Sequence, residues 1–305
     1  METPALRRTV LAAALTLAAT AAEAGPPRVV TDIRPVHSLT ASIMGETGAP
    51  ELLFDAAPDA PLTSAQRAAV DKADLVIWTG EALAPALAEA LAADRAPAAL
   101  ALLDIPALPM RIEGRMAILA DIRTGLPPQA GLDDLLTGDG DPHAGEPDGQ
   151  GHGPLDPHIW LDPANAARLA EIIALQLAEL DPANADNYRA NAAATRARLA
   201  ALTGETRAIL APARPIVIVP TAEATRYLLL RFDMQMGDLV TENDSDGAGG
   251  APPCQLLEPG RPGAAAADVI RREVDLYGTG LAPGPTLYEG LIRAVAGSVA
   301  RCARR

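Results

Sequence analysis

The sequence predicts an α/β protein with two Rossmann-like lobes, each built on a parallel sheet, joined by one long rigid helix. Short apolar, β-branched runs alternate with amphipathic segments, as they do in βαβ units. This order starts again after residue 214, behind a helical segment from 182 to about 210 that would be ~43 Å long. Ligands of open α/β sheets lie at the carboxyl ends of the strands, so we expect the functional site in a cleft between the lobes.

The first lobe contains four expected strands and two expected helices. Each strand is a short apolar run bounded by Gly, Pro or polar residues. The strands are 28–33, 51–54, 74–80 and 98–103. The helices run from about 37 to 44 and from 64 to 73, and Thr63 is the expected N-cap of the second one.

Two helices are expected next. The first runs from 163 to about 179, with Asp162 as N-cap and Pro163 at its first position. The second is the long one, capped by Asp181 with Pro182 at its first position. Its apolar seam is spaced four and three residues apart. The seam is Tyr188, Ala192, Thr195, Leu199, Leu202, Thr206 and Ile209. Such a helix is either a rigid strut between the lobes or an ordinary surface helix, and periodicity does not separate the two.

The second lobe repeats the pattern. Its expected strands are 215–219, 252–257 and 274–277, and its expected helices are 223–230 and 286–301. The resulting division is a leader 1–24, an N-terminal lobe 25–180, a linker helix 181–211 and a C-terminal lobe 212–305.

Residues 1–24 have the pattern of a cleavable signal peptide. Arg7 and Arg8 form a basic start, an apolar run follows, and 22–24 has the A-x-A form of a cleavage site. The apolar run is too short to span a bilayer. No lipobox cysteine follows, so we expect a free protein in the periplasm.

The composition narrows the function classes. The net charge is −14 and Lys72 is the only lysine, which argues against a nucleic-acid partner because phosphate binding needs clustered basic residues. Aromatic residues are only 3% of the chain, so the core must be aliphatic. In an exported chain the even pair Cys254 and Cys302 favours a disulfide over a metal site, with two free thiols as the alternative.

Three of the four histidines lie within a short stretch. His158 stands at the start of the apolar run 159–161, and we expect it at a strand-like edge beside a helix N-terminus. His143 and His152 lie in a Gly- and Asp-rich loop, 137–155. Histidine-rich tracts are typical of metal-binding segments. The alternatives are a packed histidine bonded to a carbonyl for His158 and solvated loop residues for the other two.

Motifs of covalent chemistry are missing from the sequence. It contains no G-x-S-x-G, no HExxH, no phosphate-loop signature and no paired C-x-x-C. We therefore do not expect an enzyme.

The chain resembles the zinc-specific periplasmic solute-binding proteins of ABC transporters. The resemblance covers nearly all of the expected mature chain, and its most specific segment is the run Pro-His-Ile-Trp-Leu-Asp-Pro. The matching segments are 30–39, 73–81, 156–163 and 254–259, together with the cysteine near the C-terminus. The Gly/Asp/His loop is similar to a shortened form of the family's His-rich loop. The resemblance implies a two-lobed fold, zinc as the bound ion, an ABC permease as partner and a monomer.

Family members hold zinc with three histidines, and the resemblance carries over only one of them, His158. The family's Ser-Pro-His turn reads 57–59 here and ends in Asp59. A second family histidine falls in 220–223, where Glu223 stands one residue away. The late Gly-Thr-Leu-Asp segment reads 278–281 and lacks the acid. His37 lies in a matching motif but is not a ligand in the family.

A site of His158, Asp59 and Glu223 would offer mixed nitrogen and oxygen ligands, suited to zinc and tolerant of manganese or iron. The alternative is that Asp59 and Glu223 are solvated acids with no role in metal binding. In that case the chain is a degenerate paralogue without a metal, which acts as a regulator, as an accessory protein or as a binder of another solute.

Overall fold

The computed structural model describes residues 25–58, 60–105, 109–112, 115–118, 156–220, 225–237, 252–260 and 269–304. The expected leader 1–24, the loop 137–155 with His143 and His152, and the acids Asp59 and Glu223 lie outside these ranges. In the part that is described, no helix combines the length and the apolar character needed to cross a membrane.

The N-terminal half is built on a four-stranded parallel sheet in the order β2-β1-β3-β4. Its strands are β1 (Val29–Ile33), β2 (Glu51–Phe54), β3 (Leu75–Trp78) and β4 (Ala98–Ala101). Every residue of β1 and β3 is buried, as expected for central strands covered on both faces. The register pairs Thr31 with Leu52 on one side and with Ile77 on the other.

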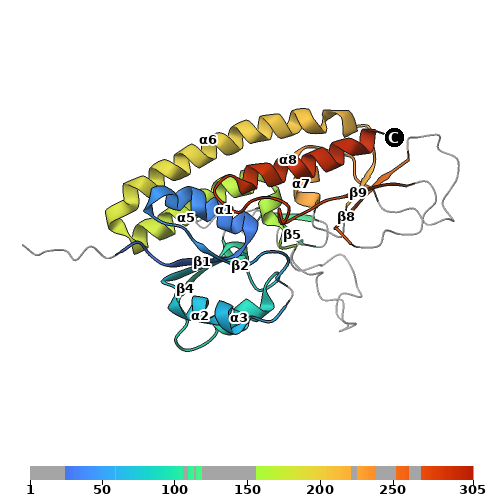
Figure 1. Cartoon of the computed structure of the whole chain (residues 1–305). Coiled ribbons are helices and arrows are strands. Elements are labelled where there is room, and N and C mark those ends of the chain that lie inside the picture. Colours follow the sequence, from blue (N-terminus) through green and yellow to red (C-terminus); the bar gives the residue numbers. More distant parts are fainter. Residues whose placement is uncertain are drawn as a thin grey trace, which may run out of the picture.

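Helices cover both faces of this sheet. The helices α2 (Ser64–Lys72) and α3 (Pro85–Leu91) lie below it in Figure 1, and α1 (Arg34–Met44) and α5 (Pro163–Leu180) lie above it. Side chains alternate between the two faces, so Val30 and Val76 pack with Trp78 in one cluster, while Val29 and Ile77 belong to the larger core.

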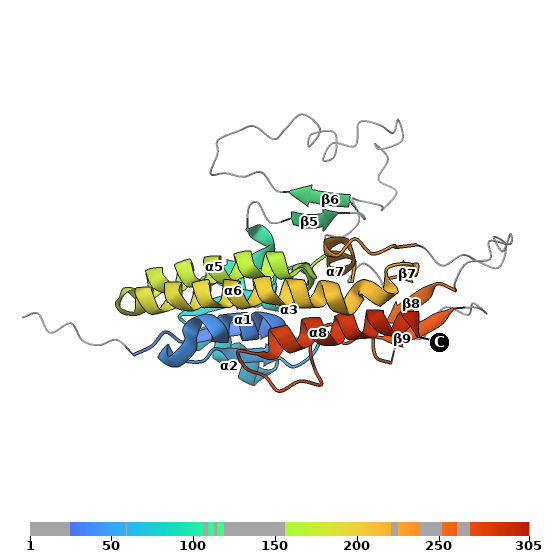
Figure 2. The same ribbon diagram turned by 90° about the horizontal axis from the view of Figure 1, so that it is seen from above.

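The C-terminal half is smaller. Its three-stranded parallel sheet has the order β7-β8-β9, formed by β7 (Ile218–Val219), β8 (Cys254–Leu257) and β9 (Ile270–Glu273). The helices α7 (Arg226–Arg231) and α8 (Leu287–Ala300) also belong to this half. A disulfide joins Cys254, at the start of β8, to Cys302, just after α8. A separate antiparallel hairpin of β5 (Pro109–Ile112) and β6 (Arg115–Ile118) lies to one side in Figure 2.

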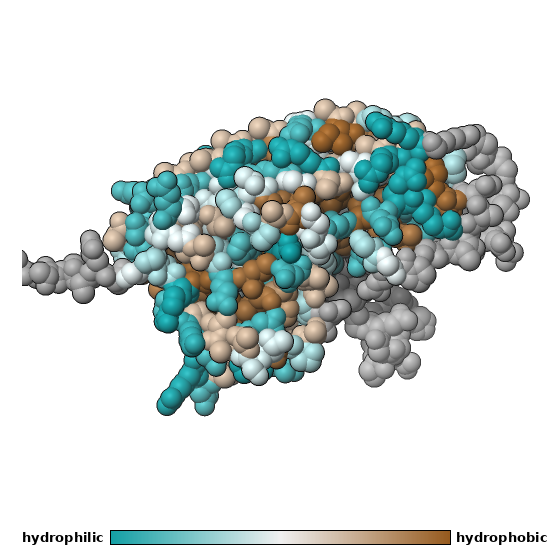
Figure 3. Space-filling model, viewed as in Figure 1, coloured by the Kyte–Doolittle hydropathy of each residue, from teal (hydrophilic) through white to brown (hydrophobic). Residues whose placement is uncertain are grey.

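The long helix α6 (Ala185–Leu210) runs along both halves and packs against α5, α1 and α8 (Figures 1 and 2). Its buried stripe follows the predicted seam, except that Leu210 is buried where Ile209 was expected to be. The outer surface over α6 and α8 carries many hydrophilic side chains, shown in teal in Figure 3. One core cluster contains residues of both halves, from Val29 to Cys302, so the division at 180 and 212 remains a proposal.

Three element boundaries differ from the prediction because carboxylates redirect the backbone. His158 does not lie on a strand-like edge; it precedes a 3-10 helix, Ile159–Leu161, because the carboxylate of Asp156 accepts its backbone N–H and starts a turn. The expected strand 274–277 is a loop. The strand in this region is β9, which ends just before it at Glu273. Asp181 bonds the side chains of Asn184 and Tyr188, so a 3-10 turn precedes α6 and Asp181 is not its N-cap.

Two other boundaries differ for backbone reasons. The expected strand 215–219 is reduced to β7, because the N–H of Ile216 still bonds the carbonyl of Ala213 in the turn after α6. The first helix begins at Arg34, three residues earlier than predicted, with Pro35 in its first turn.

Candidate metal centre

The centre of the candidate site is the pair Asp156 and His158. One carboxylate oxygen of Asp156, Oδ1, accepts the backbone N–H of His158 at 3.0 Å and lies 2.8 Å from its ring atom Nδ1. A neutral imidazole that donates from Nδ1 carries its lone pair on Nε2, which is the tautomer a metal ligand needs. Nε2 has no hydrogen-bond partner within the described ranges, and the side chain is 16% exposed.

Two aromatic rings surround this imidazole. The centroid of the Trp160 ring lies 5.0 Å from that of His158, and the centroid of Tyr277 lies 6.3 Å from it. Trp160 and Tyr277 also contact each other at 5.7 Å. Contacts with both rings restrict the orientation of the His158 imidazole.

The segment that carries His158 is fixed by side chains and carbonyls of the C-terminal half. The hydroxyl of Tyr227 donates to the carbonyl of Asp156 at 3.1 Å, and that of Tyr288 donates to the carbonyl of Trp160 at 2.6 Å. The indole N–H of Trp160 donates to the carbonyl of Leu276 at 3.1 Å. All three bonds are buried, so they hold the segment 156–160 firmly against the C-terminal half.

Two residues further on, Asp162 is held by an ion pair. Arg231 on α7 binds both carboxylate oxygens of Asp162, with Nε 2.7 Å from Oδ1 and Nη2 2.6 Å from Oδ2. The same Oδ1 accepts the N–H of Ala164, so Asp162 is the N-cap of α5 as predicted. Asp162 therefore joins the start of a helix in one half to a helix of the other.

The loop 275–281 lies beside His158 and contacts it through Tyr277. Oδ1 of Asp275 accepts the N–H groups of Tyr277 and Gly278, and Oδ2 accepts from Thr279 Oγ1 and from Gly280 N–H. Partial burial alone would raise the pKa of Asp275, but these four donors outweigh it and hold the pKa below its ordinary value. The carboxylate is therefore charged at neutral pH and fixes the loop that presents Tyr277 to His158.

The described residues do not complete a metal site. Among them, no group of three His, Cys, Asp or Glu side chains could hold an ion together. The proposed partners Asp59, Glu223, His143 and His152 all lie outside the described ranges. The described strands that precede Asp59 and Glu223 in the sequence are β2, which ends at Phe54, and β7, which ends at Val219.

His37 has a different role. Its Nε2 lies 3.1 Å from the carbonyl of Pro50, and its Nδ1 is buried. Burial lowers the pKa of His37, and the carbonyl of Pro50 opposes this only in part. It is a neutral, structural side chain that ties α1 to the residue before β2.

Sequence reasoning missed three residues that shape this centre. Asp156 was recognised only as part of a motif, although its position two residues before His158 is the spacing of a local side-chain-to-backbone turn. Asp275 gives a similar signal, because Gly278 and Gly280 follow it closely. The contacts of Tyr277 with His158 and Trp160 had no sequence signal, because they depend on the folding of distant segments.

Comparisons with known proteins agree with this architecture. The chain is 32% identical over 319 aligned positions to the high-affinity zinc uptake system protein ZnuA of Paracoccus denitrificans (strain Pd 1222), covering 96% of this chain and 97% of that protein. Among solved structures, the manganese complex of the solute-binding protein FpvC from Pseudomonas aeruginosa has a TM-score of 0.65 at 18% identity, covering 92% of this chain and 99% of that one. Zinc-bound AdcA from Streptococcus pneumoniae has a TM-score of 0.59 at 17% identity; 90% of this chain is covered, but only 58% of AdcA.

The structural matches show that the fold is that of the two-lobed solute-binding proteins. The family follows from the sequence match over residues 29–251, which is most of the chain. The chain belongs to the ZnuA family, described as the periplasmic component A of the zinc-uptake complex.

Proposed function

We propose that this chain is a periplasmic binding protein for a divalent metal ion, with zinc as the first candidate, which passes the ion to an ABC-type membrane permease. The family match and the names of the curated relatives support this proposal. The observation that carries it for this chain is the Asp156–His158 pair, in which the carboxylate leaves Nε2 available to a metal.

In this proposal the chemistry is binding and release, with no covalent step. His158 supplies one nitrogen ligand through Nε2. Asp59 and Glu223 are the proposed oxygen ligands, because zinc needs at least three protein groups when one position stays open. His143 and His152 are the proposed capture ligands of the Gly/Asp/His loop. Mixed nitrogen and oxygen ligands also suit manganese, so the identity of the metal is part of the test.

The test is metal binding by chelator-stripped full-length chain. Competition against a chromogenic chelator should give a stoichiometry of one zinc per chain, and His158→Ala should weaken the affinity by more than the ~100-fold typical of losing an outer partner. His37→Ala is the matched control, because it removes an imidazole whose Nε2 is already engaged with the carbonyl of Pro50. Asp59→Ala and Glu223→Ala should each weaken binding.

Two further measurements complete the test. Parallel titrations with Mn²⁺ decide between the metals, and deletion of 137–155 separates capture by the loop from binding in the cleft. A stripped protein that takes up no zinc, or whose affinity is the same in His158→Ala, would contradict the proposal and favour the degenerate paralogue. Growth of a zinc-limited strain that depends on this chain alone would support delivery to the permease.

A further inference from the structure

The geometry points to Arg34 as the residue that clamps the segment after β2 to the loop 275–281, the loop that carries Tyr277 against His158. This inference rests on the proposed function for its effect on metal release, but not for the clamp itself. We infer that Arg34 is a positioning residue: it holds the end of β2 in one half and the loop 275–281 in the other at a fixed separation.

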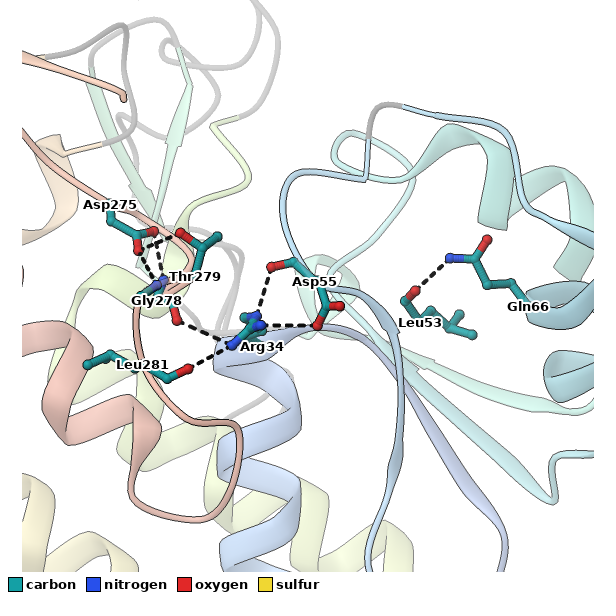
Figure 4. A network of polar contacts seen from close by, with 9 residues as sticks. Arg34, Leu53, Asp55, Gln66, Asp275, Gly278, Thr279 and Leu281 are labelled. Carbon is teal, nitrogen blue, oxygen red and sulfur yellow. Dashed lines mark hydrogen bonds and ion pairs between the residues drawn. The ribbon is translucent and has the colours of Figure 1, made fainter. Parts of the chain in front are cut away.

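Arg34 uses its planar guanidinium in two directions. On one side, Nε donates to the carbonyl of Asp55 at 2.8 Å and Nη2 lies 3.1 Å from the Asp55 carboxylate. On the other side, Nη1 donates to the carbonyls of Leu281 at 2.9 Å and Gly278 at 3.4 Å. Figure 4 shows the Arg34 side chain between these two segments. Asp55 is close in sequence, whereas Gly278 and Leu281 are 244 and 247 residues away.

The clamp is built into the fold. Arg34 is the first residue of α1, directly after β1, so its side chain leaves the carboxyl end of the central sheet where the cleft is expected. Only 11% of the side chain is exposed, although Asp55 is 82% exposed. The ion pair with Asp55 therefore contributes little by itself, and the holding comes from carbonyls that accept from a largely desolvated guanidinium.

The clamp is connected to His158 through one loop. Asp275 fixes the backbone of 277–280 by its four hydrogen bonds, so that Gly278 and Tyr277 move as one unit. Tyr277 faces the imidazole of His158, and its neighbour Gly278 bonds Arg34. Releasing the guanidinium would therefore loosen the aromatic wall of the centre and the β2 end at the same time.

A lysine is a poor substitute for this arginine. Its ammonium is a single point of charge and cannot bond two segments on opposite sides in the fixed fork of a guanidinium. Arg34→Lys keeps the charge and Arg34→Met keeps most of the volume. The matched control is Arg293→Met, which removes a guanidinium that links α8 to Glu205 on α6 at the surface, with 47% of its side chain exposed.

The first measurement needs no metal. Amide hydrogen exchange of the stripped full-length chain should become faster in 55–58 and in 275–281 together in both Arg34 variants, and should stay unchanged there in Arg293→Met. Unchanged exchange in either loop, or a wild-type pattern in Arg34→Lys, would overturn the clamp.

The second measurement is the rate of zinc release into excess chelator, which should rise about 10-fold in both Arg34 variants and not in the control. Loosened loops with a wild-type release rate would overturn the positioning role. If wild-type chain takes up no zinc, the proposed function fails, while the exchange experiment still decides whether Arg34 clamps the loops.

Discussion

Asp156 binds His158 twice through a single carboxylate oxygen, once at the backbone N–H and once at ring atom Nδ1. The second oxygen of Asp156, Oδ2, is buried and has no hydrogen-bond partner within the described ranges. One carboxylate oxygen thus starts the turn of the chain and also accepts from Nδ1 in the neutral tautomer that leaves Nε2 for a metal. The spacing of Asp156 and His158 in the sequence therefore bears on which ring nitrogen of His158 a metal could use.

The first prediction concerns this pair. Asp156→Ala should weaken zinc binding by about 10- to 100-fold, because the carboxylate that orients a ligating histidine is lost. Asp156→Asn should be milder, because the amide oxygen still accepts hydrogen bonds but has no charge. Chelator competition measures both, with the exposed Asp94→Asn as the control. Wild-type affinity in Asp156→Ala would contradict the role given to this carboxylate.

Local signals predicted much of the fold correctly. The strand Glu51–Phe54 has the predicted bounds, and Thr63 forms a full capping box with Gln66. Asp162 caps α5 with Pro163 at the first position. Each of these features depends on a few neighbouring residues, whose hydrogen bonds and backbone preferences are the same in most folds.

The remaining features depend on contacts that a linear pattern does not contain. Three of the four residues of 274–277 favour a strand, yet the carboxylate of Asp275 accepts three backbone N–H groups and turns the segment into a loop. The place of His158 depends on the hydroxyls of Tyr227 and Tyr288, which bond the carbonyls of Asp156 and Trp160 across 71 and 128 residues of sequence. The family resemblance indicated which histidine to examine, but not which groups hold it.

The second prediction separates the two tasks of Asp162. Asp162→Asn keeps an oxygen for the N-cap but removes the charge that pairs with Arg231, which should cost about 2 kcal/mol of unfolding free energy because the guanidinium stays partly exposed. Asp162→Ala also removes the cap and should cost about 1 kcal/mol more. Urea unfolding measures both, with Asp186→Ala, in a solvent-exposed pair, as the control. Equal midpoints for Asn and Ala would show that the cap contributes nothing.

The third prediction concerns the disulfide. Cys254 and Cys302 are 48 residues apart, so removing the bond in a Cys254→Ala, Cys302→Ala double variant should lower the unfolding free energy by roughly 4 kcal/mol in the chain-entropy account. Wild-type protein with a reducing agent should approach the double variant. Cys254 starts β8, at the opposite end from the carboxyl edge, so zinc affinity of the folded protein should not change. No response of the unfolding midpoint to the reducing agent would contradict the prediction.

The fourth prediction is a pH dependence of stability caused by Asp32. This carboxylate is completely buried at the end of β1, where Oδ1 accepts from Ile33 N–H and Oδ2 from Thr79 N–H. Burial raises the pKa of Asp32 from 3.8 to about 6, and the hydrogen bonds from Thr79 and Ile33 oppose the rise only in part. The folded state therefore keeps a proton that the unfolded chain releases at lower pH.

The sign follows from this difference. The stabilising contribution of protonated Asp32 is fully present below pH 3.8 and is lost as the pH rises through about 6, with a total of roughly 3 kcal/mol. Asp32→Asn cannot ionise, so the difference in unfolding free energy between wild type and this variant should shift in favour of the variant between about pH 4 and about pH 7. The comparison uses only the change of this difference with pH. Its absolute value also contains the cost of the amide introduced by Asp32→Asn, which leaves one backbone N–H without its acceptor at every pH. Urea titrations across this pH range measure the unfolding free energies, with Asp71→Asn on the exposed face of α2 as the control. Parallel plots of unfolding free energy against pH for wild type and Asp32→Asn would mean that Asp32 ionises in the folded protein as it does in water.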